Sequence, residues 1–201
     1  MLAHGAGAAM DSPFMNTIGA GLAGGGYRVA RFEFPYMAAR REGRRTGAPD
    51  RESVLLQTWR DVIAELSGGA SLVIGGKSLG GRIASMVADE TGVLGLLCLG
   101  YPFHAPGKRA DAHRLEHLRS MRTPALIIQG ERDSFGNRDE VESYRLAPSI
   151  KIAWMPDGDH SFKPRARSGH TEGGNLELAI AASIAFAKAL PKHCGARPLR
   201  A

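Results

Sequence analysis

Short apolar segments alternate with amphipathic stretches along the whole chain. Six of the apolar segments have the length of strands, and most are continuously hydrophobic, which is typical of strands covered on both faces. They lie at residues 1–4, 28–34, 71–75, 94–100, 125–129 and 151–155. Because helix-length stretches separate them, the chain consists of repeated strand–helix units. The pattern predicts an α/β fold with a doubly wound, mostly parallel sheet of about six strands and helices on both faces.

Six stretches between and after these strands are predicted as helices. They are residues 13–22, 54–66, 80–89, 111–121 and 139–146, and a last helix with Asn175 as its N-cap that ends before Pro191. The helix at 54–66 is the clearest, because Leu55, Trp59 and Ile63 recur at helical spacing.

A length of 201 residues, with no repeat, linker or shift in composition, predicts a single domain over residues 1–201. No apolar run reaches the roughly 18 residues that span a bilayer, and the first residues lack the features of a signal peptide. The two cysteines, Cys98 and Cys194, are too few for a disulfide framework. We therefore expect a cytoplasmic protein that does not bind membranes. The first strand begins at Met1, and so short an interior strand favours a natural chain that begins upstream.

The strongest local motif is Gly76-Lys77-Ser78-Leu79-Gly80, between the strand at 71–75 and a helix-like segment. This is the context of a nucleophile elbow, a sharp strand-to-helix turn that exposes a serine hydroxyl. Glycines on both sides leave room for neighbouring backbones to approach. An ordinary tight turn is the alternative. A phosphate-binding loop is excluded, because Ser71 stands where its pattern requires glycine.

A serine hydroxyl is a weak nucleophile that needs a histidine base and a carboxylate to orient that base. In folds with this elbow the order along the chain is Ser, acid, His. Asp133 follows the strand at 125–129 and is the preferred acid, with Glu131 in reserve. His160 follows the strand at 151–155 and lies in a polar loop. The predicted catalytic residues are therefore Ser78, Asp133 and His160.

Covalent attack on a carbonyl also requires hydrogen-bond donors for the oxyanion. The backbone N–H of Leu79, the residue after the nucleophile, is one predicted donor. The glycine-rich segment at residues 4–8 is suited to supply the second, for which we favour the N–H of Ala6. A turn without a ligand is the alternative. Three further residues are predicted to contact the substrate: Lys77, Tyr101 and His104.

The sequence predicts no cofactor and no metal site. His113 and His117 stand four residues apart on a predicted helix, a spacing that can bind zinc. A zinc protease carries glutamate directly after the first of these histidines, and Arg114 stands there instead. We interpret both histidines as solvated or packing residues.

The formal net charge is +6. Nucleic-acid binding is not expected, because acidic residues are mixed in throughout and no basic-aromatic platform is present. Ligands of open α/β sheets bind outside the carboxyl ends of the strands, and three loops at those ends are basic. We call this set the basic rim; its residues are Arg40, Arg41, Arg44, Arg45, Arg51, Lys108, Arg109, Lys163, Arg165 and Arg167. The basic rim is either a solvated surface or a positive field that attracts an anionic ester or thioester.

Several of these stretches together resemble the dienelactone-hydrolase-related members of the α/β-hydrolase superfamily. They are residues 4–8, 32–37, 75–81, 100–104, 129–136 and 157–164. More narrowly, they resemble the bacterial relatives of testis-expressed protein thirty and of NSL complex subunit three, from residue 4 to about residue 190. The resemblance implies the α/β-hydrolase sheet, without its usual first strands and without a lid, and the same three catalytic residues. Dienelactone hydrolases use cysteine where Ser78 stands, so their substrate is not carried over.

The sequence therefore predicts a serine hydrolase that cleaves a carboxylic ester or thioester of a small molecule through an acyl-enzyme. A catalytically silent α/β-hydrolase scaffold that binds protein partners is the alternative, which the chromatin-linked relatives suggest. The joint presence of Ser78, Asp133 and His160 favours the enzyme, since a scaffold has no physical need for all three. The oligomeric state is not predicted.

Overall fold

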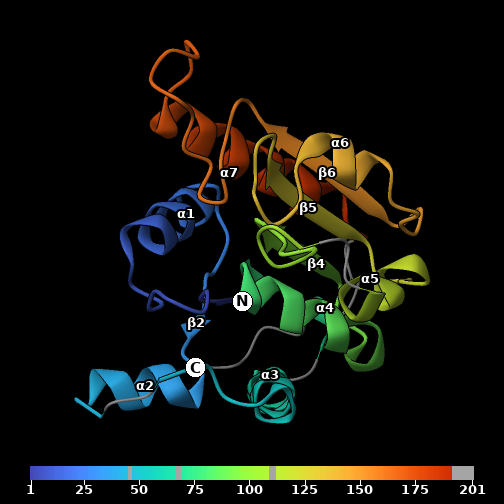
Figure 1. Ribbon diagram of the computed structural model, residues 1–201. Coiled ribbons are helices and arrows are strands. Elements are labelled where there is room, and N and C mark those ends of the chain that lie inside the picture. The colour runs from blue at the N-terminus through green and yellow to red at the C-terminus, as the bar shows by residue number, and fades with distance from the viewer. Residues whose placement is uncertain (45–46, 67–68, 109–111, 192–201) are drawn as a thin grey trace.

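Six parallel strands form one sheet at the centre of the molecule (Figure 1). The computed structural model describes residues 1–44, 47–66, 69–108 and 112–191. The strands are β1 (Leu2–Ala3), β2 (Arg31–Phe32), β3 (Val73–Lys77), β4 (Gly95–Leu99), β5 (Ala125–Gly130) and β6 (Ile150–Met155). Their order in the sheet is β2-β1-β3-β4-β5-β6. All six predicted strands are therefore confirmed, although the first two are much shorter than predicted.

Helices cover both faces of this sheet (Figure 1). The helices are α1 (Pro13–Gly24), α2 (Pro35–Arg41), α3 (Glu52–Glu65), α4 (Leu79–Thr91), α5 (Ala112–Arg119), α6 (Arg138–Glu142) and α7 (Glu172–Ala189), with one 3₁₀ turn at Gly69–Ser71. α1 and α7 pack together on one face, and α3, α4 and α5 lie on the other. The predicted doubly wound α/β fold is confirmed.

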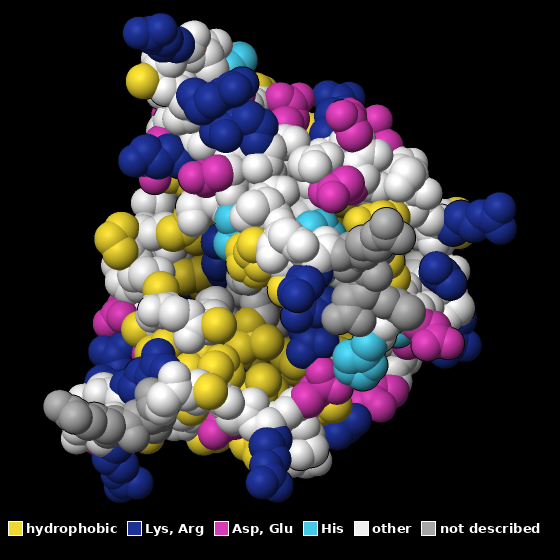
Figure 2. All heavy atoms as spheres, in the orientation of Figure 1, with side chains coloured by type: hydrophobic (Ala, Val, Ile, Leu, Met, Phe, Trp, Pro, Cys, Tyr) yellow, Lys and Arg dark blue, Asp and Glu magenta, His cyan; other side chains and the backbone are white. Residues whose placement is uncertain are grey.

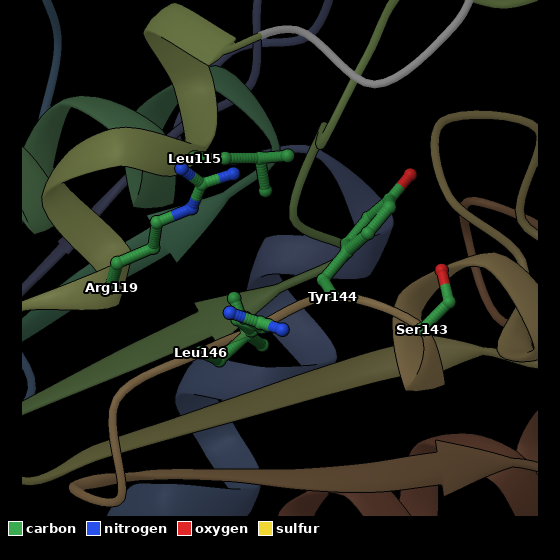
Figure 3. Close-up of a pocket in the computed structure, with 6 residues that line it drawn as sticks. Leu115, Arg119, Ser143, Tyr144 and Leu146 are labelled. Carbon is green, nitrogen blue, oxygen red and sulfur yellow. The ribbon is translucent and has the colours of Figure 1, made fainter.

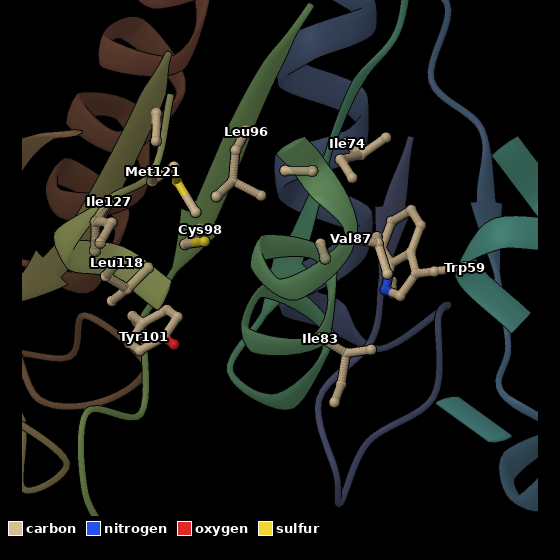
Figure 4. Close-up of a cluster of buried hydrophobic side chains, with 14 of the residues drawn as sticks. Trp59, Ile74, Ile83, Val87, Leu96, Cys98, Tyr101, Leu118, Met121 and Ile127 are labelled. Carbon is tan, nitrogen blue, oxygen red and sulfur yellow. The ribbon is translucent and has the colours of Figure 1, made fainter. Parts of the chain in front are cut away.

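Alternate side chains of the central strands point to opposite faces and form two separate cores. In β4, Leu96 and Cys98 pack with α3, α4 and α5, whereas Leu97 and Leu99 pack with α1 and α7. All four side chains are buried. Figure 4 shows the first core, in which Trp59 of α3 lies beside the helix α4. Burial on both faces is why the apolar pattern of these strands is continuous rather than alternating.

The direction in which strands are added to the sheet reverses at β1. This reversal makes the carboxyl ends of β1 and β3 the expected ligand site. The chain passes from β1 outward to β2, then returns across β1 to β3 and continues to β6. In open parallel sheets, ligands bind outside the carboxyl ends of the strands at such a reversal. The segments that follow β1 and β3 therefore meet at the candidate site.

The last helix begins earlier than predicted, and Asn175 is not its N-cap. The side chain of Thr171 caps α7 by accepting a hydrogen bond from the N–H of Gly174 (3.0 Å). Two glycines in the first turn disfavour a helix on propensity alone, so the sequence pattern places the start after them. The Asn175 side chain is buried instead, and it donates to the carbonyls of Pro156 (2.9 Å) and Phe162 (2.7 Å).

The sequence pattern does not predict α2, because seven residues are too few to show helical periodicity. Pro35 occupies its first turn, where the missing N–H has no partner to lose. Two residues of the basic rim, Arg40 and Arg41, therefore lie in the last turn of a helix and not in a loop.

Three residues named from the sequence, Arg45, Arg109 and Cys194, lie outside the described residues. Cys98 is buried in β4, as expected of a small hydrophobic side chain. Among the described helices, none is both long and apolar enough to cross a bilayer.

His117 is held between α5 and α4 in its neutral form. Its Nε2 atom lies 2.8 Å from Oγ of Ser85, which itself donates to the carbonyl of Arg82 (2.6 Å). The serine oxygen therefore accepts from the imidazole. Burial, together with the charge of Arg82, lowers the pKa of His117 to about 4.

We expect His117 to make the protein less stable in acid. The unfolded side chain binds a proton near its ordinary pKa of 6.5, whereas the folded one does so at about 4. Its contribution to stability is therefore complete above pH 6.5 and is lost as the pH falls through 4, at most about 3 kcal/mol. Urea unfolding at about pH 7 and about pH 4 should show this loss in the wild type and a smaller loss in His117→Gln. The control is His170→Gln, since His170 is exposed; equal losses in all three proteins would contradict the assignment.

Candidate active site

Ser78 stands at the sharp turn between β3 and α4 in a backbone conformation that side chains rarely adopt. Its φ is 50° and its ψ is −113°, and it is the N-cap residue of α4. Such a conformation costs about 1–3 kcal/mol and persists only when the surroundings enforce it. Here the N–H of Ser78 donates to the carbonyl of Leu99 (3.0 Å), and its carbonyl accepts from the N–H of Arg82 (3.0 Å). The turn predicted at Ser78 is thus a strained elbow held by β4 and α4.

Two glycines of the motif allow the elbow to pack directly on β1. A Cβ atom on Gly76 would collide with the carbonyl oxygen of Ala3, and one on Gly80 would lie 2.6 Å from the carbonyl oxygens of both Ala3 and His4. Any larger residue at either position would push β1 away from β3 and α4. The glycines therefore bring the segment after β1 beside Ser78.

The side chains of Ser78, His160 and Asp133 form one hydrogen-bonded chain, although they are far apart in the sequence. The Nε2 atom of His160 lies 2.9 Å from Oγ of Ser78, and its Nδ1 lies 2.8 Å from Oδ2 of Asp133. A carboxylate only accepts, so Nδ1 carries the proton and the Nε2 lone pair faces the serine hydroxyl. In this arrangement the hydroxyl proton can pass to His160 as the oxygen attacks an electrophile.

Asp133 is fully buried, and other groups hold its carboxylate in place. Its Oδ1 accepts from the N–H of Phe135 (2.8 Å), and its Oδ2 accepts from Nε2 of Gln129 (2.9 Å) in addition to His160. The ring of Phe135 packs on the imidazole of His160 with 4.2 Å between ring centres. The loop after β5, residues 131–137, therefore orients the imidazole of His160 through both a carboxylate and a ring.

Gln129 was not predicted as a site residue, yet its side chain binds Asp133 and the backbone on both sides of the site. Its amide donates to Asp133 and to the carbonyls of Tyr101 (3.2 Å) and Gly136 (3.1 Å), and its Oε1 accepts from the N–H of Tyr101 (2.7 Å). Gln129 is completely buried. The one sequence signal for it is an amide side chain at the end of an apolar strand, where a buried polar group needs partners.

The two other carboxylates near His160 are engaged elsewhere. Glu131, the reserve acid, pairs with Arg138 (3.0 Å) and accepts from the N–H of Asp157 (2.9 Å). Asp159 accepts from the N–H of Ser161 (2.8 Å) within its own loop. Asp133 is therefore the carboxylate that the structure brings to His160.

The loop after β1 lies against the elbow and is held by two aromatic side chains. His4 donates from Nδ1 to the carbonyl of Gly5 (2.6 Å), since its Nε2 accepts from the N–H of Phe34 (3.1 Å). The Tyr36 hydroxyl donates to the carbonyls of Gly5 (3.3 Å) and Ala6 (3.2 Å). In a trans peptide the N–H points opposite to the carbonyl, so the Ala6 N–H points away from these two rings.

Burial keeps both supporting side chains, His4 and Tyr36, in their neutral forms. It lowers the pKa of His4, which keeps the imidazole neutral, and it raises the pKa of Tyr36 to about 12. A Cβ atom on Gly5 would lie 3.7 Å from Cβ of Ser78, so this loop borders Ser78. Sequence reasoning found the loop, which includes His4, but not the support from Tyr36, because Tyr36 belongs to the unpredicted helix α2.

Lys77, predicted to contact the substrate, is half-buried, and its ammonium binds the protein itself. Its Nζ donates to the carbonyl oxygen of His160 (2.6 Å) and lies 5.5 Å from the centre of the Phe14 ring. Burial lowers the pKa of Lys77 to about 8, although the charges of Asp133 and Asp159 oppose this shift. The side chain of Lys77 points to the α1 face of the sheet because successive side chains of a strand alternate.

The structure corrects the prediction that Tyr101 and His104 contact the substrate. Tyr101 has no exposed surface, and its hydroxyl donates to the carbonyl of Arg114 (2.8 Å). His104 is 3% exposed, with Nδ1 2.9 Å from the carbonyl of Ala105 and Nε2 3.4 Å from a carboxylate oxygen of Glu140. Both residues follow β4 and turn inward, so they support the fold beneath the site.

Carboxylates neutralise several arginines of the basic rim. Arg41 binds Asp11 (2.9 Å) and Glu33 (2.6 Å), and Arg44 binds Glu42 (3.2 Å). In the third loop, Arg165 forms an ion pair with Asp157 and lowers the pKa of that carboxyl to about 2. Lys108, Lys163 and Arg167 are exposed. The field of the basic rim is therefore weaker than the number of basic residues implies.

No group of histidine, cysteine, aspartate and glutamate side chains suited to a metal ion occurs among the described residues. His113 lies 3.3 Å from a carboxylate oxygen of Glu52, and His117 binds Ser85. The two histidines therefore act as packing and surface residues between helices.

A surface cavity elsewhere on the molecule does not coincide with this hydrogen-bonded chain. A cavity of about 260 Å³ lies between α5 and the segment after α6 (Figure 3). It is lined by Leu115, Arg119, Ser143, Tyr144, Arg145 and Leu146. None of these residues contacts Ser78 or His160, so hydrogen-bond geometry rather than cavity size identifies the candidate site.

Comparison with known families and solved structures agrees with the fold. The alpha/beta hydrolase domain family matches residues 1–188. Similar solved structures include an alpha-beta serine hydrolase homologue from Coxiella burnetii (20% identity, TM-score 0.65, 90% of this chain and 83% of that chain). Another is the esterase domain of a Rhodothermus marinus protein (19% identity, TM-score 0.64, 94% and 85%). A third is a member of the α/β serine hydrolases without lid from Xanthomonas campestris (19% identity, TM-score 0.61, 90% and 81%).

At these identities the solved structures establish the likeness of fold. The narrower resemblance to dienelactone hydrolases and to the chromatin-linked relatives stays a prediction.

Gln129 provides a stability test of the buried network. Gln129→Leu removes the partners of several buried polar groups, including the carboxylate of Asp133. We expect a loss of at least about 2 kcal/mol in the free energy of unfolding, because each unsatisfied buried group costs roughly 1–3 kcal/mol. Urea unfolding measures this loss. The matched control is Gln57→Leu on the exposed face of α3, and an equal, small effect of both changes would contradict the role of Gln129.

Proposed function

The chain belongs to the alpha/beta hydrolase domain family, and on that premise we propose that it is a serine hydrolase that cleaves a carboxylic ester or thioester. The substrate is a small molecule. The observation that carries this proposal is the hydrogen-bonded chain from Ser78 through His160 to Asp133, with distances of 2.9 and 2.8 Å.

The proposed reaction has two halves. Oγ of Ser78 attacks the carbonyl carbon while its proton passes to Nε2 of His160, and Asp133 stabilises the resulting imidazolium. The tetrahedral intermediate collapses, His160 protonates the leaving oxygen or sulfur, and an acyl-enzyme on Ser78 remains. Water then attacks the acyl carbonyl with His160 as base, which releases the acid and restores the serine hydroxyl.

We assign the oxyanion hole to the backbone N–H groups of Leu79 and Ala6. Leu79 opens α4, and the first N–H groups of a helix have no carbonyl partner within it. The peptide between Gly5 and Ala6 has its carbonyl fixed by His4 and Tyr36, so the N–H of Ala6 is preorganised. In well-studied hydrolases one such donor contributes about 3 kcal/mol to stabilising the transition state.

The surface beside the site favours an acyl group that is at least partly apolar. Figure 2 shows hydrophobic side chains gathered in a hollow between the surface of α2 and that of α4. Leu79 is half-buried at the start of α4, whereas Tyr36 and Met37 of α2 are buried beneath this surface. Apolar surface of this kind binds a hydrocarbon chain by removing it from water.

A silent scaffold is not favoured by these observations. A buried carboxylate and a strained serine each cost stability, and a partner-binding surface needs neither. In an enzyme both features are useful, because the buried carboxylate orients the base and the strained turn presents the serine hydroxyl to it.

We expect Ser78→Ala to abolish both labelling by a fluorophosphonate and the hydrolysis of p-nitrophenyl esters. The loss of turnover should be about 10⁴-fold or more, and Asp133→Asn should cost about as much, because the three residues act as a unit. Mass mapping of the labelled peptide checks the site. Ser53→Ala, on the exposed surface of α3, is the matched control. Undiminished labelling of Ser78→Ala would refute the assignment.

Because ion pairs offset much of the charge of the basic rim, we expect the protein to discriminate little between neutral and anionic esters. Two short esters that differ only in a distal carboxylate should be hydrolysed with kcat/KM values within a few-fold of each other at low salt. The physical reason is that the charges of Arg41, Arg44 and Arg165 are already offset by neighbouring carboxylates. A large preference for the anionic ester that shrinks as salt is added would show that the exposed cations attract substrate after all.

A further inference from the structure

The ammonium of Lys77 lies beside the proposed base and binds the backbone carbonyl of His160. Resting on the function proposed above, we propose that Lys77 is a positioning residue that fixes the backbone of His160. It thereby sets the distance between the imidazole and the nucleophile that follows Lys77 in the chain.

The contact between Lys77 and His160 connects the end of β3 to the loop that carries the imidazole. Lys77 is the last residue of β3, so its backbone position is set by the sheet. Its Nζ donates to the carbonyl oxygen of His160 over 2.6 Å. In the part of the chain that the structure describes, no other hydrogen bond reaches that carbonyl. Any movement of the His160 backbone away from Ser78 would therefore break this bond.

Hydrogen bonds within the loop hold the rest of it, and one of them reaches the peptide group that Lys77 binds, because the N–H of Ser161 donates to Oδ1 of Asp159 (2.8 Å). The N–H of Phe162 donates to the carbonyl of Asp159 (2.9 Å), and the N–H of Asp159 donates to the carbonyl of Lys163 (3.0 Å). Phe162 adopts a φ of 69°, a strained value that the chain must enforce. Its ring packs on Phe14 with 5.4 Å between centres. These contacts close the turn, whereas the bond from Lys77 connects it to the end of β3.

Phe14 of α1 braces the lysine and the loop together. Its ring contacts Phe162 on one side, and the Lys77 ammonium lies 5.5 Å from its centre. A Cβ atom on Gly100 would lie 2.8 Å from Nζ of Lys77 and 3.3 Å from Cε1 of His160. The ammonium and the imidazole thus border the same small space, where only glycine fits.

Removing the Lys77 ammonium from water costs free energy. This cost supports a specific role for its hydrogen bond to His160. Burial disfavours the ammonium, and the carboxylates of Asp133 and Asp159 favour it. With a pKa of about 8 the side chain is charged at neutral pH. A methionine of similar length would fill the space without that cost but would leave the carbonyl of His160 without its donor.

The test compares the wild type with Lys77→Met and Lys77→Gln, using a neutral p-nitrophenyl ester over a range of pH. Lys151→Met, on the exposed side of β6, is the matched control and should behave as the wild type. In both Lys77 variants we expect kcat to fall about 10²-fold, the size of effect that a misplacement of about 1 Å produces. The KM should stay within about twofold, because Lys77 does not contact the ester.

The pH profile separates this role from a general structural one. Removing a positive charge beside the imidazole makes the ring easier to protonate, so the acidic limb of kcat/KM should move to higher pH. Unchanged kcat in folded variants would overturn the proposal. It would equally be overturned by unchanged kcat with a raised KM for an anionic ester, because Lys77 would then bind substrate. Circular dichroism checks folding, and Gln serves where Met perturbs the fold.

A second readout does not depend on turnover. The ¹⁵N and ¹H resonances of the His160 ring report its bond to Asp133, and both Lys77 variants should shift them and their pH titration. Unshifted ring resonances would overturn the positioning role. If the wild type neither reacts with a fluorophosphonate nor hydrolyses esters, the proposed function fails while the ring resonances still decide whether Lys77 positions His160.

Discussion

The direct packing of the β1 backbone on the elbow is the constraint on which the rest of this site depends. The carbonyl oxygens of Ala3 and His4 come so close to Gly76 and Gly80 that no side chain fits between them. This contact places the loop after β1 beside Ser78 and closes the sheet at the point where its strand order reverses. The two-residue strand β1 holds an interior position between β2 and β3, and glycines let it pair closely on its β3 side.

A chain of satisfied polar groups then fixes the three side chains relative to this backbone contact. Gln129 holds the carboxylate of Asp133, the carboxylate holds the imidazole of His160, and the imidazole meets the serine hydroxyl. Ser78, Asp133 and His160 follow the carboxyl ends of three different strands, β3, β5 and β6, so these links join separate parts of the sheet. The strained φ of Ser78 is tolerated because β4 and α4 bind both of its backbone groups. Local strain is therefore offset by contacts that only the assembled sheet provides.

The sequence predicts the parts that local pattern determines and misses those that depend on distant partners. The six strands, the elbow at Ser78 and the loops of Asp133 and His160 follow from buried apolar segments and the polar turns after them. The role of Gln129 depends on partners in other loops, which no periodicity reveals. The burial of Tyr101 is missed because a pattern does not give the direction of a side chain beyond the end of a strand. Short elements such as α2 and the glycine-rich start of α7 fall below the length at which helical periodicity can be detected.

Two opposite charges flank the proposed base, and neither is independent of the other. Asp133 binds the imidazole of His160 on its Nδ1 side, and Lys77 binds the carbonyl of the same residue. The carboxylate raises the pKa of the buried lysine, so each charge lowers the cost of burying the other. A site that held only one of them would carry an uncompensated charge at its centre. Asp133 therefore orients His160 through its ring and, as proposed, Lys77 orients it through its backbone, while the carboxylates of Asp133 and Asp159 explain how an ammonium can lie so close to the proposed nucleophile.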